Sequence, residues 1–265
     1  MAGIRSWLFG PGHSERILSR IFDGGADVVL LDLEDAVPAD QKSRARQQVR
    51  EALADHPDAW VRINKPGGDL AAADLAAVAG RCAGIRVPKV ESAADVEWVA
   101  ERAGNLPLTC SIESALGVVR AVEIASCART RDLTYGGADL SLDLGIEGGW
   151  EESLYVRSAL VVASRAAGKR PPIDGVYTRL DDLEGLRRES EAVRRLGYFG
   201  KSAIHPSQVP VINDVFQPSP SELSWARRVV EAFQRAGGAA TRLDDGEFVD
   251  APVAERARRI LEWRK

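Results

Sequence analysis

The sequence predicts an α/β fold: a (β/α)8 TIM barrel followed by a C-terminal helical extension. The chain has 265 residues, a length at which one barrel forms a complete domain. Short β-rich runs alternate eight times with longer amphipathic stretches, at a spacing of about 25 residues. Several short runs, such as VVLLDL (28–33) and LTCSI (108–112), are continuously apolar. Continuous apolar runs are typical of parallel strands that are covered on both faces.

The elements follow in regular order along the chain. The expected strands are Ser6–Gly10, Asp27–Leu33, Trp60–Asn64, Gly84–Val90, Leu108–Glu113, Asp132–Gly137, Pro171–Val176 and Gly200–His205. The expected helices are Ser14–Phe22, Lys42–Ala54, Leu70–Arg81, Ala93–Ala103, Ala115–Cys127, Ser153–Ala167, Asp182–Leu196 and Pro206–Phe216. An open Rossmann-like sheet is the alternative, but no GxGxxG follows the first strand.

A second region follows the eighth βα unit. We expect a catalytic barrel domain over 1–216 and an extension over 217–265. Within the extension, Ser221–Ala236 and Ala251–Trp263 are predicted helices, and a loop or hairpin lies between them. A barrel does not need this segment, so we expect it to pack on a neighbouring subunit.

Composition narrows the class of protein. The formal net charge is −4 and no basic stripe is present, which argues against nucleic-acid binding. The three cysteines form no CxxC pair, as expected in a reducing compartment. No apolar run approaches the roughly 18 residues that span a bilayer, and the first residues lack secretory features. These observations predict a cytoplasmic protein without a membrane partner.

The active site of a barrel lies where the strands end at their carboxyl side, so the residues there are the candidates. They are Glu34 and Asp35, Arg62, Lys89, Glu113, Asp139, Asp174 and His205. So many carboxylates at one edge repel one another unless a cation lies among them.

Magnesium is the cation that best suits these ligands. Mg²⁺ binds oxygen, keeps several waters and uses one or two carboxylates together with substrate. Glu113 and Asp139, at adjacent strand ends, are the best pair. A structural alternative is that such carboxylates cap the following helix or pair with an arginine. Zn²⁺ is not expected, because no His/Cys cluster has ligand spacing.

The cations at the strand ends have two possible roles each. Arg62 suits bidentate recognition of a carboxylate or a developing enolate oxygen, and Glu34 can pair with it or orient it. Lys89 could form a Schiff base, although an ion-paired lysine is the simpler interpretation. Lys201 lies early in its strand and is a weaker candidate. The histidines are not arranged for a catalytic triad, and GxSxG is absent.

Eight ordered motifs extend over nearly the whole chain. They are RSWLFGPG (5–12), ADVVLLDLEDAV (26–37), WVRIN (60–64), RVPKVESAADV (86–96), IESALGV (112–118), GGADLSLDLG (136–145), GKSAIHPSQV (200–209) and DGEFVDAP (245–252). With these motifs the sequence resembles the citrate lyase β-subunit-like proteins of the HpcH/HpaI aldolase/citrate lyase family. That group contains Mg²⁺-dependent hydroxyketoacid aldolases and CoA-ester lyases.

The resemblance implies a role for each candidate. It implies Mg²⁺ held by Glu113 and Asp139, and Arg62 in contact with the oxoacid or enolate. It implies a CoA thioester entering over the first loop, at Phe9, Gly10 and Pro11. In related lyases an Asp of the C-terminal segment completes the site of an adjacent subunit. The residue that matches this Asp is Asp250, and Glu34 and Asp35 are further catalytic candidates.

The sequence departs from the family pattern at two places. Ser14 stands where many relatives have an arginine of the first loop, which leaves Arg16 and Arg20 as candidate phosphate contacts. Ala138 stands before Asp139 where many relatives have an acidic residue, a change that bears on metal affinity or substrate choice.

The activity implied is cleavage, or condensation, of a 3-hydroxy-3-carboxyacyl-CoA thioester such as malyl-, citramalyl- or citryl-CoA. The products would be an oxoacid and acetyl-CoA, and the assembly a homotrimer or a multiple of one. Two alternatives stay open. One is a class II hydroxyketoacid aldolase that needs no CoA, and the other is a citrate lyase β subunit that depends on partner subunits and acts on an acyl-carrier-protein thioester.

Overall fold

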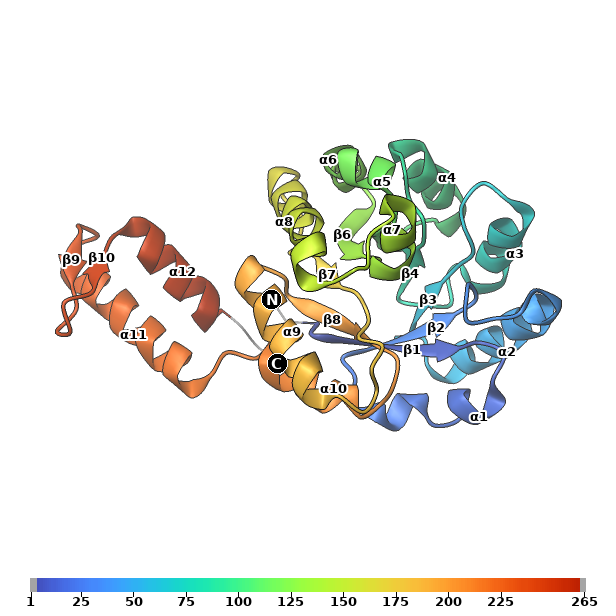
Figure 1. Cartoon of the computed structure of the whole chain (residues 1–265), viewed down its shortest axis with the longest axis horizontal. Helices are drawn as coiled ribbons and strands as arrows, with labels where there is room; N and C mark the ends of the chain where they lie inside the picture. Colours follow the sequence, from blue (N-terminus) through green and yellow to red (C-terminus); the bar gives the residue numbers. More distant parts are fainter. Residues whose placement is uncertain (1–3, 263–265) are drawn as a thin grey trace. The chain divides into compact units, whose positions relative to one another are not determined.

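A computed structural model describes residues 4–262, which divide into two compact units, Ile4–Phe216 and a C-terminal unit that begins at Gln217. In the first unit, eight parallel strands pair in sequence order and close into a barrel (Figure 1). The predicted (β/α)8 fold is confirmed. The strands are β1 (Ser6–Pro11), β2 (Val28–Asp32), β3 (Trp60–Arg62), β4 (Gly84–Val87), β5 (Leu108–Ile112), β6 (Thr130–Tyr135), β7 (Ile173–Asp174) and β8 (Gly200–Ala203).

Helices surround the strands (Figure 1). They are α1 (Glu15–Leu18), α2 (Lys42–Asp55), α3 (Asp69–Val78), α4 (Ala93–Ala103), α5 (Ala115–Val119), α6 (Ala121–Ser126), α7 (Gly137–Leu144), α8 (Trp150–Ala166), α9 (Leu183–Leu196) and α10 (Gln208–Val215). Short 3-10 turns lie at Ile21–Gly24 and Ala39–Gln41. Side-chain caps fix several starts: the Ser92 hydroxyl accepts from the Asp95 N–H at α4, and Asp182 caps α9.

The structure differs from the predicted helices at three places. The helix expected at 14–22 is a single α turn followed by a 3-10 turn that Gly25 ends at φ +68°. The helix expected at 115–127 is broken at Arg120, whose ψ of 11° interrupts the helical backbone. The sequence did not predict α7, which starts directly after β6, so Asp139 lies in the first turn of a helix instead of on a strand end.

Large aromatic side chains fill the amino-terminal part of the barrel interior. The rings of Trp7 and Trp60 meet edge to face, 5.1 Å apart. Gly84 makes room for them, because a Cβ there would lie 2.3 Å from the Trp60 ring. The Arg86 guanidinium lies 4.8 Å from the Trp7 ring. Since β1 and β4 are not neighbours, this contact runs through the interior, and Arg86 points inward.

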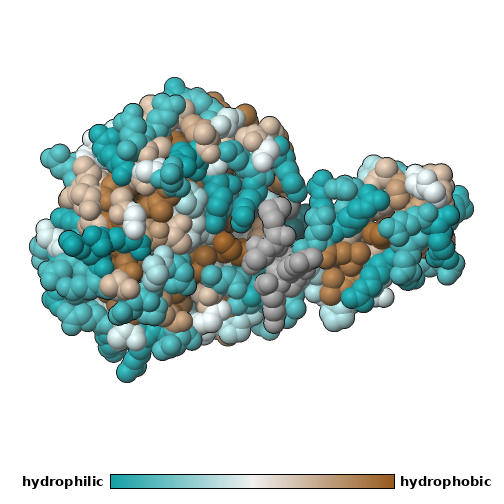
Figure 2. All heavy atoms as spheres, turned by 180° about the vertical axis from the view of Figure 1, so that it is seen from behind, coloured by the Kyte–Doolittle hydropathy of each residue, from teal (hydrophilic) through white to brown (hydrophobic). Residues whose placement is uncertain are grey.

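The main apolar core lies between the strands and the surrounding helices, with Leu31, Val61, Ile85 and Leu133 among its members. On the face seen in Figure 2, hydrophilic residues cover most of the surface, with smaller apolar areas between them. Within residues 4–262, no helix is both long and apolar enough to cross a membrane.

The C-terminal unit has its own small core. Its helices α11 (Pro220–Arg235) and α12 (Ala251–Leu261) pack on each other, and between them β9 (Thr241–Arg242) and β10 (Phe248–Val249) form an antiparallel hairpin. Ser219 and Glu222 form a capping box at the start of α11. The core includes Val229, Phe233, Val249 and Ala254. The end of the predicted helix Ala251–Trp263 at Trp263 lies outside the described residues.

Candidate active site

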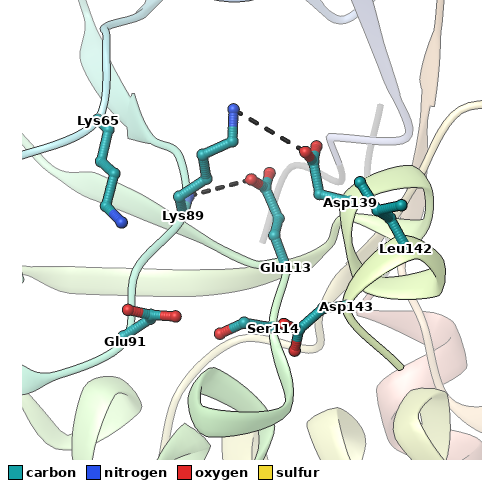
Figure 3. Close-up of a pocket in the computed structure, with 8 residues that line it drawn as sticks. All are labelled: Lys65, Lys89, Glu91, Glu113, Ser114, Asp139, Leu142 and Asp143. Atoms are coloured by element: carbon teal, nitrogen blue, oxygen red, sulfur yellow. Dashed lines mark hydrogen bonds and ion pairs between the residues drawn. The ribbon is translucent and has the colours of Figure 1, made fainter. Parts of the chain in front are cut away.

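A cavity of about 250 Å³ opens at the carboxyl end of the barrel, where the fold places active sites. Its lining comes from the segments that follow β3, β4, β5 and β6 (Figure 3). The lining residues are Lys65, Lys89, Glu91, Glu113, Ser114, Asp139, Leu142 and Asp143. The two carboxylates predicted as metal ligands therefore lie in one pocket.

Glu113 is the buried carboxylate of this pocket, only 7% exposed. It follows β5 directly, and one of its oxygens accepts a hydrogen bond from the Lys89 backbone N–H at 3.1 Å. Gly136 gives it space, because a Cβ there would lie 2.2 Å from the Glu113 Cγ. Burial and the negative charges of Glu34 and Asp139 raise the pKa of Glu113 to about 7, against the opposing effect of Arg62.

Asp139 is the second carboxylate, with its side chain 42% exposed. It stands in the first turn of α7, and Figure 3 shows its carboxylate on the far side of the Lys89 ammonium from Lys65. The Lys89 Nζ lies 4.0 Å from it. Since Asp139 raises the pKa of Glu113, the two carboxylates repel each other, and a cation between them would relieve that repulsion.

The Lys89 ammonium lies near carboxylates that follow two strands: Glu34 and Asp35 after β2, and Asp139 after β6. Its backbone has φ +52°, a left-handed conformation that is strained for a residue with a side chain. Its Nζ donates to Glu34 at 2.7 Å and to Asp35 at 3.1 Å. Partial burial disfavours the charged ammonium, but the hydrogen bonds and negative charges of Glu34 and Asp35 together outweigh it, and the pKa of Lys89 is raised. Lys89 is therefore an ion-paired ammonium, a poor nucleophile for a Schiff base.

Arg62 is held by two carboxylates. Its Nε and Nη2 donate to both oxygens of Asp32 at 2.7 and 2.6 Å, and its Nη1 lies 2.9 Å from Glu34. The predicted pairing with Glu34 is present. Burial opposes the charge on Arg62, but the two acids outweigh it and raise its pKa.

Asp32 was not singled out from the sequence. It is fully buried at the end of β2, and it also accepts the backbone N–H of Glu34 at 2.9 Å. The signal was available: Asp32 is the only charged residue inside the apolar run VVLLDL. A charge in such a run needs a partner, and Arg62 of the adjacent strand supplies it.

Phe9 was expected in the first loop but lies within β1, and two guanidinium groups lie near its ring. The Arg62 Cζ is 4.8 Å and the Arg86 Cζ 5.3 Å from its ring centroid. Arg86 is almost fully buried, and its Nη1 donates to the Ser202 hydroxyl at 3.0 Å. Burial lowers the pKa of Arg86 to about 9. The sequence did not single out Arg86 as a functional residue.

The other predicted residues have the following surroundings. Gly10 packs against Ile21, since a Cβ there would lie 2.3 Å from that side chain. Pro11 ends β1, and Arg16 and Arg20 are exposed at α1 and the turn after it. Ala138 is exposed beside Asp139. Asp250 belongs to the C-terminal unit, where its side chain caps α12 by accepting the Val253 N–H at 3.1 Å.

Asp174, placed among the strand-end carboxylates by the sequence, does not line this pocket. It is fully buried and pairs with Lys201 and with Arg157 of α8. Glu189 of α9 pairs with Lys201 at 2.6 Å. Because helix residues are its partners, the Asp174 side chain points outward from β7, and Lys201 has a structural partner there.

The pocket fits a magnesium ion better than a metal held by protein side chains alone. Among residues 4–262 there is no group of three His, Cys, Asp or Glu side chains arranged as a metal site. Glu113 and Asp139 provide two hard oxygen ligands, the number that Mg²⁺ uses when substrate and water complete its shell.

Comparison with known proteins shows the family of the chain. The HpcH/HpaI aldolase/citrate lyase family profile matches residues 5–206. A (3S)-malyl-CoA thioesterase from Cereibacter sphaeroides is 38% identical over 97% of this chain and 93% of its own length. A citrate lyase subunit beta-like protein from Mycobacterium tuberculosis is 36% identical over 96% of this chain and 93% of its own length.

A solved structure is similar over almost the whole chain. It is the protein CitE from M. tuberculosis in complex with magnesium, acetoacetate and coenzyme A. Its TM-score is 0.85 at 35% identity, covering 98% of this chain and 97% of that one. A second structure is the citrate lyase beta subunit of the same organism with oxaloacetate and magnesium, at TM-score 0.74 and 34% identity over 82% and 98%. The chain is an enzyme of the lyase type and belongs to the HpcH/HpaI aldolase/citrate lyase family.

Proposed function

We propose that this enzyme cleaves, or forms in reverse, the carbon–carbon bond of a 3-hydroxy-3-carboxyacyl-CoA thioester. The substrate would be of the malyl-, citramalyl- or citryl-CoA type, and the products an oxoacid and acetyl-CoA. The observation that carries the proposal is the buried Glu113 beside Asp139 in the pocket next to Arg62. Similar proteins with magnesium, oxoacids and coenzyme A bound support it.

Glu113 and Asp139 would hold Mg²⁺, with Glu113 kept in place by the Lys89 N–H and by the space at Gly136. When bound, Mg²⁺ supplies a Lewis acid for the carboxylate and hydroxyl oxygens of the substrate. Lys89 stays protonated and keeps Glu34 and Asp35 charge-balanced. These two carboxylates thus support the site by orienting the cations.

Cleavage moves one proton off the substrate hydroxyl and one proton onto carbon. The electron pair of the broken bond passes to the thioester, which leaves as an enolate. Arg62, already fixed by Asp32, would stabilise the negative charge that develops on oxygen. Asp250 would deliver the proton to the enolate carbon, and would remove it in the condensation direction.

Asp250 would act in the site of an adjacent subunit of a homotrimer or a multiple of one. In this account 1–216 is the catalytic domain, and 217–265 is an extension that packs on the neighbour. Co-expression of Glu113→Gln and Asp250→Asn chains tests this. Mixed assemblies would regain part of the activity that each pure variant lacks, whereas sites built within single chains would stay inactive.

The carboxyl end of β1 and the residues after it would contact the thioester. Phe9, Gly10 and Pro11 would line the path of the thioester, with Arg16 and Arg20 at its phosphates. Ala138, beside Asp139, would contact the acyl group. The three cysteines are free thiols, which supports a cytoplasmic location for the enzyme.

Thioester hydrolysis is a second candidate, favoured by the 38% identical malyl-CoA thioesterase. One experiment separates the two reactions. The purified protein is incubated with Mg²⁺ and malyl-, citramalyl- or citryl-CoA, and the products are identified by mass. Acetyl-CoA with an oxoacid supports the lyase reaction, whereas free CoA with the intact hydroxyacid shows hydrolysis and contradicts it.

Three further outcomes identify the remaining alternatives. Turnover of free hydroxyketoacids without CoA would show a class II aldolase. Turnover only after partner subunits with an acyl-carrier thioester are added would show a citrate lyase β subunit. Activity that resists EDTA, with borohydride trapping of pyruvate on Lys89, would show a Schiff-base aldolase.

A further inference from the structure

Lys65 is a pocket cation that the reaction above does not use. It follows Asn64, a buried residue whose amide donates to the Leu33 carbonyl at 2.9 Å and to Asp74 at 2.6 Å. The Asn64 side-chain oxygen also accepts from Lys42 at 2.8 Å. These bonds fix the backbone from which the Lys65 side chain extends into the pocket (Figure 3).

The two lysines of the pocket differ in their partners. Lys89 is shared by Glu34, Asp35 and Asp139. Within residues 4–262, no hydrogen bond or ion pair is made by the Lys65 ammonium; its side chain lies beside Glu91 in Figure 3 without such a contact. Lys65 is therefore the pocket cation that can receive an incoming anion without first releasing a protein carboxylate.

Lys65 and Asp139 lie on opposite sides of the pocket. In Figure 3, Lys65 stands on one side, Asp139 on the other, and Glu113 between them. The cavity, about 250 Å³, is below the ~300–1,000 Å³ that drug-sized ligands occupy, so it suits a small acid. A small acid held at the Glu113–Asp139 side by one carboxylate would direct a second carboxylate toward Lys65.

We propose that Lys65 binds a second carboxylate of the acyl group, and thereby selects substrates whose oxoacid product is a dicarboxylate. This rests on the proposed function, since it takes the first carboxylate to be held at the metal side. A lysine ammonium is a compact charge suited to a single carboxylate. A site with such a charge discriminates strongly against an analogue that lacks the matching group.

Binding of two oxoacids that differ by one carboxylate tests the inference without turnover. Freshly dissolved oxaloacetate and pyruvate are titrated into the full chain by calorimetry at saturating Mg²⁺. We expect wild type to favour oxaloacetate, and Lys65→Met to weaken oxaloacetate by about tenfold while pyruvate is unchanged. Lys65→Arg keeps the charge and would retain most of the preference.

Several other outcomes of these titrations would overturn the role given to Lys65. Equal losses for both oxoacids, no loss in Lys65→Met, or a wild type that binds neither oxoacid would overturn the inference. Weaker binding of free coenzyme A in Lys65→Met, with oxaloacetate unaffected, would assign Lys65 to the thioester carrier and also overturn it. Glu91→Gln is the control for the neighbouring carboxylate and would leave the oxaloacetate preference in place.

Failure of the proposed function would look different. If oxaloacetate is preferred through Lys65 but the acyl-CoA panel is not cleaved, the inference stands and the lyase reaction is wrong. If acetyl-CoA is released but Lys65→Met accepts one- and two-carboxylate substrates in the wild-type ratio, the reaction stands and the inference is wrong.

Discussion

Asp32 and Arg62 form a bidentate ion pair between neighbouring strands, with Nε–O and Nη2–O distances of 2.7 and 2.6 Å. The pair fixes the plane of the guanidinium and leaves its third nitrogen facing Glu34 at 2.9 Å. Asp32 is fully buried, so its charge depends on this arginine. Asp32 thus fixes the orientation of Arg62, the group proposed to stabilise the developing negative charge on oxygen.

Asp32→Asn tests that relationship. The amide cannot accept both guanidinium bonds, so Arg62 loses its fixed orientation, and we expect kcat to fall on the order of 10–100-fold. Breaking a buried pair also costs about 3–5 kcal/mol of folding free energy. Steady-state kinetics, Mg²⁺ titration and thermal unfolding measure these effects. Wild-type kcat in a folded variant would contradict the role given to Asp32.

Gly136→Ala tests the placement of Glu113. The new Cβ would lie 2.2 Å from the Glu113 Cγ, so the carboxylate must move, and we expect Mg²⁺ affinity to fall at least about tenfold. Gly68→Ala is the matched control, because a Cβ there meets nothing within 4 Å. Equal Mg²⁺ affinity in both variants, measured by calorimetry, would remove Glu113 from the metal site.

The affinity for Mg²⁺ should depend on pH around the raised pKa of Glu113, about 7. Below this pH the ion must displace a proton, so apparent affinity falls by about tenfold per pH unit; above it, affinity is flat. Calorimetry in buffers of different ionisation enthalpy reports the proton released. The measurement runs from about pH 5.5 to about pH 8, which covers about one unit or more on each side of the pKa. An affinity for Mg²⁺ that does not change over this range would argue against Glu113 as a ligand.

The same pKa predicts how stability changes without metal. The pKa of Glu113 is higher in the folded chain than its ordinary value of 4.5, so the native state binds more protons between about 4.5 and 7. Its contribution to the free energy of unfolding is therefore largest at the acid end and is lost as pH rises toward 7. Glu113→Gln removes this dependence, which denaturant unfolding at several pH values can measure.

Arg86→Met tests whether the buried charge of Arg86 stabilises the folded barrel. Arg86 is almost fully buried beside Trp7 and Phe9, and burial lowers its pKa to about 9. Arg86 has no ion-pair partner among residues 4–262, so an apolar side chain of similar volume removes the cost of burying its charge. We expect an unchanged or higher Tm in thermal unfolding. A Tm lowered by several degrees would show that Arg86 stabilises the interior.

The barrel could be predicted because its signals are local and repeated. Continuous apolar runs such as VVLLDL identify parallel strands, and all eight expected strands are present. Boundaries were harder, since hydrophobic periodicity does not reveal a break of backbone geometry such as the one at Arg120. Helix α7 was missed because its start, GGAD, reads as a loop of small residues.

The candidate site was predicted in part. Because active sites of barrels lie at the carboxyl ends of the strands, we expected the residues there to lie close together. Lys89, Glu113 and Asp139 do line one pocket, and Lys89 pairs with Glu34. It failed for Asp174, because whether a strand residue faces the axis or the helices depends on register, which a two-residue strand hardly defines. Sequence alone did not single out Lys65, because its lack of a partner among residues 4–262 is a property of the folded pocket.

A crystal of the protein with Mn²⁺ in place of Mg²⁺ and oxaloacetate gives the most direct test. Anomalous scattering should show one ion bound by the side chains of Glu113 and Asp139, with oxoacid oxygens completing its shell. An ion bound elsewhere, or oxaloacetate bound with no ion between these two carboxylates, would contradict the assignment of the metal site.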